Sequence, residues 1–176
     1  MTSGSSKNVI RGKVWKFGDS VDTGVIAPHY RAPTPEELRK ATMDAYRPEF
    51  AKEVKPGDII VGGKNFGYGS SRETAHTVLR DVGIAAIVAE SVSALYFRQA
   101  ISFGMPIFAV PGVTDLVEDG DHIEIDYAGG AIRNPRTGKS LPMAQYPPLI
   151  ERIFKSGGII PLLVQEYAKK QEGKRT

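Results

Sequence analysis

The feature that most constrains the fold is a regular alternation of apolar and helix-like segments over residues 58–110. Three apolar segments recur, namely DIIVGG at 58–63, IAAIVA at 84–89 and PIFAV at 106–110. Residues 71–82 and 91–103, which lie between them, have the apolar spacing of helices, and Gly104 follows the second. Strands that alternate with helices in this way are expected to be parallel with right-handed crossovers, so the run predicts a βαβαβ core.

Weaker signals predict elements before this core. Residues 9–17, VIRGKVWKF, have the β-branched and aromatic content that is typical of a strand. Thr34 and Glu37 have the spacing of a capping box with Pro35 at the first helical position, which predicts a helix that runs to about Tyr46.

The segment after the core predicts a hairpin and two helices. DHIEIDY at 121–127 alternates like a half-exposed strand, and the glycines at 129 and 130 mark a turn into AIRNP. PPLIERIFKSGG at 147–158 indicates a helix that ends at glycine, and PLLVQEYAKK at 161–170 a second amphipathic helix. We therefore expect one domain over 9–168, a disordered segment at 1–8 and a basic flexible tail at 169–176.

Composition excludes several classes of protein. The 176-residue chain has no cysteine, so it cannot supply thiolates to a disulfide, a zinc site or an iron–sulfur cluster. Its three histidines lack metal-ligand spacing, so no metal site is expected. The net charge is only +3, with basic residues clustered at the C-terminus alone, which does not indicate nucleic-acid binding. The apolar runs are too short to cross a membrane and no signal peptide is evident, so we expect a cytoplasmic protein.

The loop NFGYGSSRE at 65–73 is the leading candidate site. It follows a predicted strand, at the end of the sheet where open α/β proteins bind ligands. Gly67 and Gly69 allow the backbone to approach a ligand closely, and the amides at the start of the next helix favour an anion. Arg72 offers a two-point contact to a carboxylate or phosphate.

A purely structural interpretation of the same loop stays open. Ser70 and Glu73 have the spacing of a capping box, and capping boxes occur in proteins of every function. The loop also lacks the lysine of a nucleotide-binding P-loop. A cap does not explain why Ser71 and Arg72 occupy the same turn.

Two stretches together resemble a known family. GKNFGYGSSRETA at 63–75 and GDSVDTGVIAP at 18–28 are similar to motifs of the small subunits of 3-isopropylmalate dehydratases, which match the mobile swivel domain of aconitase. The likeness extends from about Gly12 to Gly158, with the motifs in the same order and spacing. It implies an α/β fold of the aconitase swivel type, with three layers, β/β/α, around the βαβαβ parallel core.

The resemblance also implies an activity and a set of site residues. It implies a hydro-lyase that dehydrates or isomerises a hydroxy-dicarboxylate, most simply 3-isopropylmalate in leucine biosynthesis. In this family the first serine of the pair, here Ser70, is the base that removes the substrate proton. Ser71 and Arg72 then bind the substrate, together with the polar pair Asp22 and Thr23. A serine can act as a base only where its anion is stabilised and solvent is excluded.

The resemblance places the cofactor outside this chain. Family members act only with a large subunit, and that subunit carries a [4Fe-4S] cluster, so we expect an iron–sulfur large subunit as the partner and no cofactor here. This division of labour agrees with the absence of cysteine.

Several residues bear on the choice of substrate. Tyr68, Thr74 and Gly24 stand where the family usually has cysteine, histidine and aspartate. PHYRAPTPEEL at 28–38 corresponds to the family's specificity loop, and its residues His29 and Arg31 are candidates for contact with the substrate.

Alternative functions remain open on the sequence. Arg31 favours an extra carboxylate, as in homoaconitate, unless it is an ordinary exposed loop arginine. The alternatives are therefore the same chemistry on homoaconitate, the same chemistry on a methylated malate of the 2,3-dimethylmalate or citramalate type, and a noncatalytic anion-binding module that shares the fold.

Overall fold

The computed structural model describes residues 8–70 and 72–172. The predicted substrate-binding residue Ser71 lies outside the described residues, as do residues 1–7, which make up most of the segment predicted to be disordered, and residues 173–176.

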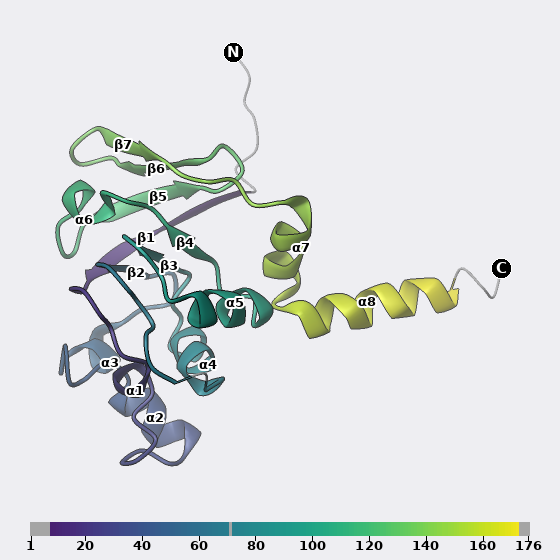
Figure 1. Ribbon diagram of the computed structural model, residues 1–176, viewed down its shortest axis with the longest axis horizontal. Coiled ribbons are helices and arrows are strands. Elements are labelled where there is room, and N and C mark those ends of the chain that lie inside the picture. The colour runs from purple at the N-terminus through teal and green to yellow at the C-terminus, as the bar shows by residue number, and fades with distance from the viewer. Residues whose placement is uncertain (1–7, 71, 173–176) are drawn as a thin grey trace.

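The described residues form a seven-stranded mixed sheet in the order β4-β3-β2-β1-β5-β6-β7 (Figure 1). The strands are β1 (Val9–Lys16), β2 (Ile59–Gly62), β3 (Ala86–Ala89), β4 (Ile107–Ala109), β5 (His122–Asp126), β6 (Ala131–Asn134) and β7 (Lys139–Pro142). Strands β1 to β4 pair with one another in parallel, whereas β5 pairs antiparallel with β1, and β6 and β7 follow by antiparallel pairing. The parallel pairing of β2, β3 and β4 confirms the predicted βαβαβ core.

Helices connect and cover the strands. They are α1 (Thr23–Ile26), α2 (Pro35–Ala41), α3 (Phe50–Glu53), α4 (Thr74–Asp81), α5 (Ala94–Ser102), α6 (Val113–Leu116), α7 (Pro148–Ser156) and α8 (Ile159–Glu172). Helices α4 and α5 form the two crossovers of the parallel core, as predicted. The four-residue helices α1, α3 and α6 have no apolar periodicity long enough to be recognised in the sequence.

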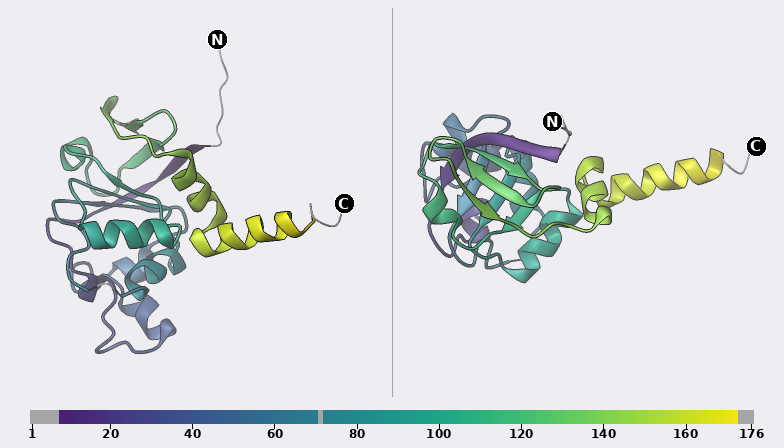
Figure 2. Two further views of the ribbon diagram at one scale, coloured as in Figure 1. Left: turned by 45° about the vertical axis from the view of Figure 1, so that its right-hand side comes forward. Right: turned by 90° about the horizontal axis from the view of Figure 1, so that it is seen from above.

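Alternate side chains of the parallel strands enter two separate cores, one on each face. Trp15 and Ile60 belong to the core that α1 to α5 cover, whereas Val14 and Ile59 belong to the core shared with β5 and β6. The sheet therefore folds over itself, so that the antiparallel strands form a layer of their own (Figures 1 and 2). This arrangement confirms the predicted three layers, β/β/α.

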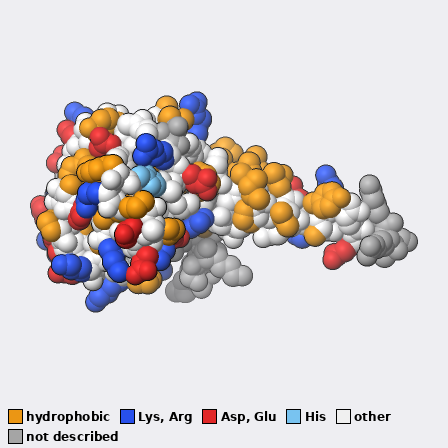
Figure 3. All heavy atoms as spheres, turned by 90° about the horizontal axis from the view of Figure 1, so that it is seen from below, with side chains coloured by type: hydrophobic (Ala, Val, Ile, Leu, Met, Phe, Trp, Pro, Cys, Tyr) orange, Lys and Arg blue, Asp and Glu red, His pale blue; other side chains and the backbone are white. Residues whose placement is uncertain are grey.

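The C-terminal helix α8 projects away from the body of the molecule (Figures 1 and 2). It extends through Glu172, so residues 169–172 are helical and do not belong to the predicted flexible tail. Lys169, Lys170 and Gln171 are good helix formers and therefore continue the helix beyond its last contact with the body. Hydrophobic side chains gather along one side of this helix (Figure 3).

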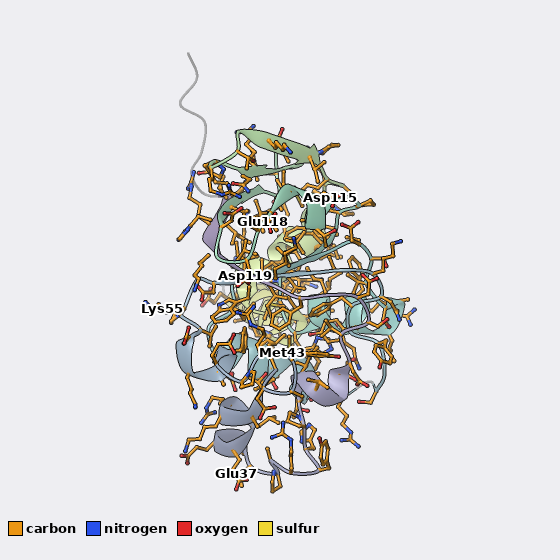
Figure 4. All side chains as sticks on the ribbon, turned by 90° about the vertical axis from the view of Figure 1, so that its left-hand side faces the viewer. Glu37, Met43, Lys55, Asp115, Glu118 and Asp119 are labelled. Atoms are coloured by element: carbon orange, nitrogen blue, oxygen red, sulfur yellow. The ribbon has the colours of Figure 1, made fainter. Side chains whose placement is uncertain are left out.

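Helix α2 is shorter than the sequence predicts. The predicted capping box of Thr34 and Glu37 is present, but the helix ends at Ala41 and not near Tyr46. Met43 adopts a left-handed conformation with φ of 60° and is fully buried, and its amide donates to Val25 O at 3.2 Å. Figure 4 shows Met43 near the centre of the molecule, whereas Glu37 lies at its edge. Burial of Met43 thus ends the helix.

Candidate functional site

The two segments that resemble the family motifs lie side by side at the carboxyl ends of β1 and β2. The amide of Thr23 donates to Tyr68 O at 2.9 Å, and the amide of Gly67 donates to Val21 O at 2.9 Å. Asp22 and Tyr68 form an isolated parallel bridge. Each parallel strand is thus extended by its following loop, and the polar residues of both loops meet where α/β sheets bind ligands.

Ser70 is held directly by Thr23, which is 47 residues away in the sequence. The Ser70 amide donates to Thr23 Oγ1 at 2.8 Å, and the two hydroxyl oxygens are 3.4 Å apart. Thr23 is buried, whereas Ser70 is exposed. The structure therefore brings two predicted site residues together, one accessible and one buried behind it.

Gly67 and Gly69 have left-handed backbone conformations that permit this approach. Gly67 has a φ of 74°, and a Cβ added there would lie 2.2 Å from the ring of Tyr96. Gly69 has a φ of 106°, and a Cβ added there would lie 2.8 Å from Thr23 Oγ1. Both glycines are thus required for close packing as well as for the turn.

The carboxylate of Asp22 stabilises the upstream loop. It caps α1 by accepting a hydrogen bond of 2.6 Å from the amide of Gly24. Its charge and a hydrogen bond raise the pKa of the exposed Tyr68 phenol above the usual value. The amide of Asp22 donates to the hydroxyl of Tyr46 at 3.0 Å. Tyr46 and the buried Tyr96 support the site, and neither carries a local sequence signal.

Helix α4 begins after the serine loop without the cap that the structural interpretation requires. Its N-cap residue is Glu73, and no side chain caps it by hydrogen bonding. Ser70 instead contacts Thr23, so the capping-box interpretation of Ser70 and Glu73 is wrong. Arg72 is exposed and has no hydrogen-bond or ion-pair partner within residues 8–70 and 72–172. Its guanidinium is therefore available to a ligand.

The two candidate residues of the specificity loop have partners of their own. His29 is half-buried, and its Nε2 hydrogen-bonds Thr74 Oγ1 on α4. Arg31 forms a two-point ion pair with Asp44, and the hydrogen bonds raise the pKa of its guanidinium. Neither side chain has a hydrogen bond to Ser70 among the described residues.

A small pocket of about 160 Å³ lies between the specificity loop and α4. Most of its lining is apolar, and the residues that contribute include His29, Pro33, Leu38, Thr74 and Val78. His29 and Thr74, which hydrogen-bond each other, lie on its wall. The pocket offers room for a small aliphatic group beside the loop that the sequence marks for specificity.

The described residues offer neither a metal site nor a membrane-spanning helix. Within the described residues, no group of three or more His, Asp or Glu side chains is placed to hold a metal ion. No helix in this part of the chain is both long and apolar enough to span a membrane.

Comparisons with known proteins identify the family. A family model described as the aconitase C-terminal domain matches residues 23–108. The isopropylmalate/citramalate isomerase small subunit of Methanocaldococcus jannaschii is 43% identical over 94% of this chain and 99% of that protein. The 3-isopropylmalate dehydratase small subunit of Aquifex aeolicus is 45% identical over 91% of this chain and 97% of its own length.

The chain belongs to the 3-isopropylmalate dehydratase small-subunit family. A crystal structure of 3-isopropylmalate dehydratase from M. jannaschii agrees with a TM-score of 0.85 at 34% identity, over 94% of this chain and 99% of that one. These matches confirm the predicted family and the predicted swivel-domain fold. The roles predicted for Ser70, Arg72 and the other site residues stay predictions.

Proposed function

We propose that this chain is the small subunit of a heteromeric hydro-lyase that dehydrates and isomerises a hydroxy-dicarboxylate, with 3-isopropylmalate as the preferred substrate. The observation that carries the proposal is the contact of the exposed Ser70 with the buried Thr23. Arg72 follows two residues later in the same loop, and its guanidinium has no partner among the described residues. Membership of the dehydratase small-subunit family supports the reaction class.

Ser70 acts as the base in this proposal. Once Ser70 has lost its proton, Thr23 is the only proton donor of the two hydroxyls, so Thr23 Oγ1–H donates to the Ser70 anion across the 3.4 Å separation. Thr23 Oγ1 also accepts the Ser70 amide at 2.8 Å, which fixes the direction of the serine. Thr23 is therefore a positioning residue, because it is buried and acts on the substrate through Ser70.

Arg72 binds a substrate carboxylate in this proposal. Its planar guanidinium offers two parallel donors, and the pairing is strongest where water is excluded. Its positive charge also favours the Ser70 anion. The contribution of Ser71 rests on the resemblance alone, because this residue lies outside the described part of the chain.

The site needs a partner to exclude water. Ser70, Arg72 and Tyr68 are all exposed, and a serine anion in contact with water would be protonated at neutral pH. We infer that a large subunit covers this face. The chain has no cysteine and the described residues hold no metal-binding group, so a [4Fe-4S] cluster would belong to that subunit. There it would supply a Lewis acid for the departing hydroxyl group.

The environment of Arg31 supports a substrate without a third carboxylate. The guanidinium is already paired with Asp44, so a carboxylate on the substrate would have to displace that partner. The mainly apolar pocket beside His29 supports an alkyl side group instead. The name of the M. jannaschii relative includes citramalate, which makes a methylated malate the second candidate.

The experiment is anaerobic reconstitution with the cognate large subunit. Turnover is measured on 3-isopropylmalate, citramalate and homoaconitate, with each subunit alone as the control. We expect activity only in the mixture, with the highest kcat/KM on 3-isopropylmalate. Activity of this chain alone would contradict the two-subunit proposal, and an active mixture that prefers homoaconitate would contradict the proposed substrate. A tight but wholly inactive pair would instead indicate a noncatalytic module.

A further inference from the structure

The carboxylate of Asp22 lies against the turn that precedes Ser70. Asp22 and Tyr68 form an isolated parallel bridge, so the aspartate lies beside the serine loop. A Cβ added at Gly69 would lie 3.0 Å from Asp22 Oδ1 and 2.8 Å from Thr23 Oγ1. A negative charge is therefore present next to the residue that precedes the proposed base.

No positively charged side chain of the described residues neutralises this carboxylate. Within residues 8–70 and 72–172, no lysine or arginine forms an ion pair with Asp22, although Arg72 is unpaired on the same loop. Asp22 Oδ1 accepts a hydrogen bond of 2.6 Å from the amide of Gly24. An anion held by an amide keeps its charge, and this charge would repel the carboxylates of a hydroxy-dicarboxylate substrate.

Tyr68 supplies a second donor to the carboxylate. The bridge between the two residues places their side chains on the same face of the paired segments, so the phenol lies beside the carboxylate. The negative charge of Asp22 and a hydrogen bond to it raise the pKa of Tyr68, and the phenol therefore keeps its proton at neutral pH. Tyr68 is also 39% exposed, on the surface that a substrate would approach.

We propose that Tyr68 is a positioning residue whose hydroxyl shields the substrate and the Ser70 anion from the charge of Asp22. Without this hydroxyl, Asp22 would compete with the substrate for the guanidinium of Arg72 and would oppose loss of the Ser70 proton. The inference rests on the proposed function. It gives Asp22 a different role from the direct substrate contact that the family resemblance implies.

Tyr46 provides a matched comparison at the same aspartate. Its hydroxyl accepts a hydrogen bond of 3.0 Å from the Asp22 amide and donates to Ser20 O at 3.4 Å. Tyr46 and Tyr68 are 40% and 39% exposed, so the two phenols have similar access to solvent. Tyr46 therefore holds the backbone of Asp22, whereas Tyr68 acts on its carboxylate.

The first test measures kcat and KM in the enzyme reconstituted with the large subunit. Tyr68→Phe removes the hydroxyl but keeps the ring, so KM for 3-isopropylmalate is expected to rise about 10-fold, with a smaller change in kcat. The rising limb of the pH–rate profile should move to higher pH, because the unshielded charge raises the pKa of Ser70. Tyr167→Phe, on α8, is the control and should leave both unchanged. Either an unchanged KM or an unshifted profile in Tyr68→Phe would overturn the proposal.

The second test removes the charge that Tyr68 shields. Asp22→Asn keeps an oxygen that can accept from the Gly24 amide, so the cap of α1 is retained. Combined with Tyr68→Phe, it is expected to return KM to within about 3-fold of the wild type, because the two substitutions act on one interaction. A double variant as impaired as Tyr68→Phe would show that the phenol binds the substrate itself, and would overturn the proposal. So would an equal rise of KM in Asp22→Asn alone, since the carboxylate would then bind the substrate.

Tyr46→Phe tests whether the rescue is specific to the carboxylate. Its hydroxyl contacts the backbone of Asp22, so Asp22→Asn is not expected to rescue any loss that Tyr46→Phe causes. Equal rescue of Tyr46→Phe and Tyr68→Phe would indicate a general effect of the lost charge and would overturn the role of Tyr68.

The third test needs no turnover. An NMR titration of the chain alone follows the Tyr68 phenol, and Tyr68→Phe assigns its signal. In Asp22→Asn the pKa of this phenol is expected to fall towards the ordinary value of about 10, because the neighbouring charge is absent. An unchanged pKa would overturn the contact. A wild-type mixture without turnover would refute the proposed function and this role with it, whereas normal wild-type turnover with an unchanged KM in Tyr68→Phe would refute this role alone.

Discussion

The amide of Ser70 donates a hydrogen bond of 2.8 Å to Thr23 Oγ1, and the hydroxyl oxygens of these residues are 3.4 Å apart. Ser70 is exposed at the end of one loop, while Thr23 is buried at the start of α1. This contact fixes the orientation of a serine that caps no helix. In the proposed mechanism, Ser70 meets the substrate and Thr23 acts through Ser70.

Replacement of Ser70, the proposed base, is the first test of these roles. In the reconstituted enzyme, Ser70→Ala is expected to lower kcat by roughly two to four orders of magnitude, which is typical for loss of a general base. The melting temperature should change little, because the side chain does not cap α4. Ser140→Ala, on the exposed edge strand β7, is the control. Turnover of Ser70→Ala close to that of the wild type would refute the assignment.

Thr23 offers a test of positioning. Thr23→Val keeps the shape of the side chain but removes both contacts to Ser70, so kcat should fall about 10-fold to 100-fold. Because the substitution removes a hydrogen-bond donor to the Ser70 anion, the rising limb of the pH–rate profile should also move to higher pH. This shift is the diagnostic result. Thr23→Ser restores the hydroxyl and should recover most of the activity. An unshifted profile in Thr23→Val would leave Thr23 with a purely structural role.

Gly67 tests the close packing beneath the loop. Gly67→Ala would force a residue with φ of 74° to place its Cβ against the ring of Tyr96, so we expect a loss of about 2–4 kcal/mol in the free energy of unfolding. Chemical denaturation measures it. Gly138→Ala is the matched control, because Gly138 has a similar φ of 69° but a Cβ there meets nothing within 4 Å. Equal effects of the two substitutions would contradict the packing argument.

Because of the buried His76, the folded protein is expected to lose stability in acid. The ring is 1% exposed, and within the described residues its Nδ1 has no hydrogen-bond partner. Desolvation lowers its pKa from 6.5 to about 4. The unfolded chain therefore binds a proton more readily than the folded chain, so stability falls as the pH decreases from about 6.5 towards 4.

Substitution of His76 isolates this effect from that of the carboxylates. His76→Phe preserves an aromatic ring against Tyr96 and Phe103 but does not titrate. Between neutral pH and pH 4, the wild type should lose up to about 3 kcal/mol more unfolding free energy than the variant. Denaturation at a series of pH values measures the difference, and parallel curves would show that His76 does not titrate in this way.

The pairing of Arg31 with Asp44 predicts how specificity can be changed. Asp44→Asn removes the negative partner, so kcat/KM on homoaconitate should rise relative to 3-isopropylmalate, by roughly 10-fold if Arg31 reaches the substrate. Stability should change little, since the pair is partly exposed. Lys40→Gln, which disrupts an exposed ion pair on α2, is the control. An unchanged ranking of substrates would remove Arg31 from the specificity site.

Local patterns in the sequence were sufficient to predict the parallel core of the fold. The apolar runs that become β2, β3 and β4 are short and continuous because each strand is buried on both faces. Spacing also predicted α4 and α5, and the glycines at 67 and 69 marked the loop that has positive φ angles. The order of motifs led to the family, which the comparisons confirm.

Tertiary structure alone decided the contacts that the proposed chemistry uses. Thr23 and Ser70 are 47 residues apart, and their contact exists only because β1 and β2 are parallel neighbours whose following loops pair. Burial of Met43 ended α2 early, and pairing with β6 created the edge strand β7. Such features depend on groups distant in the chain, so no local propensity reports them. The sequence by itself determined the strands, the glycine loop and the presence of a serine, while the fold decided what that serine touches.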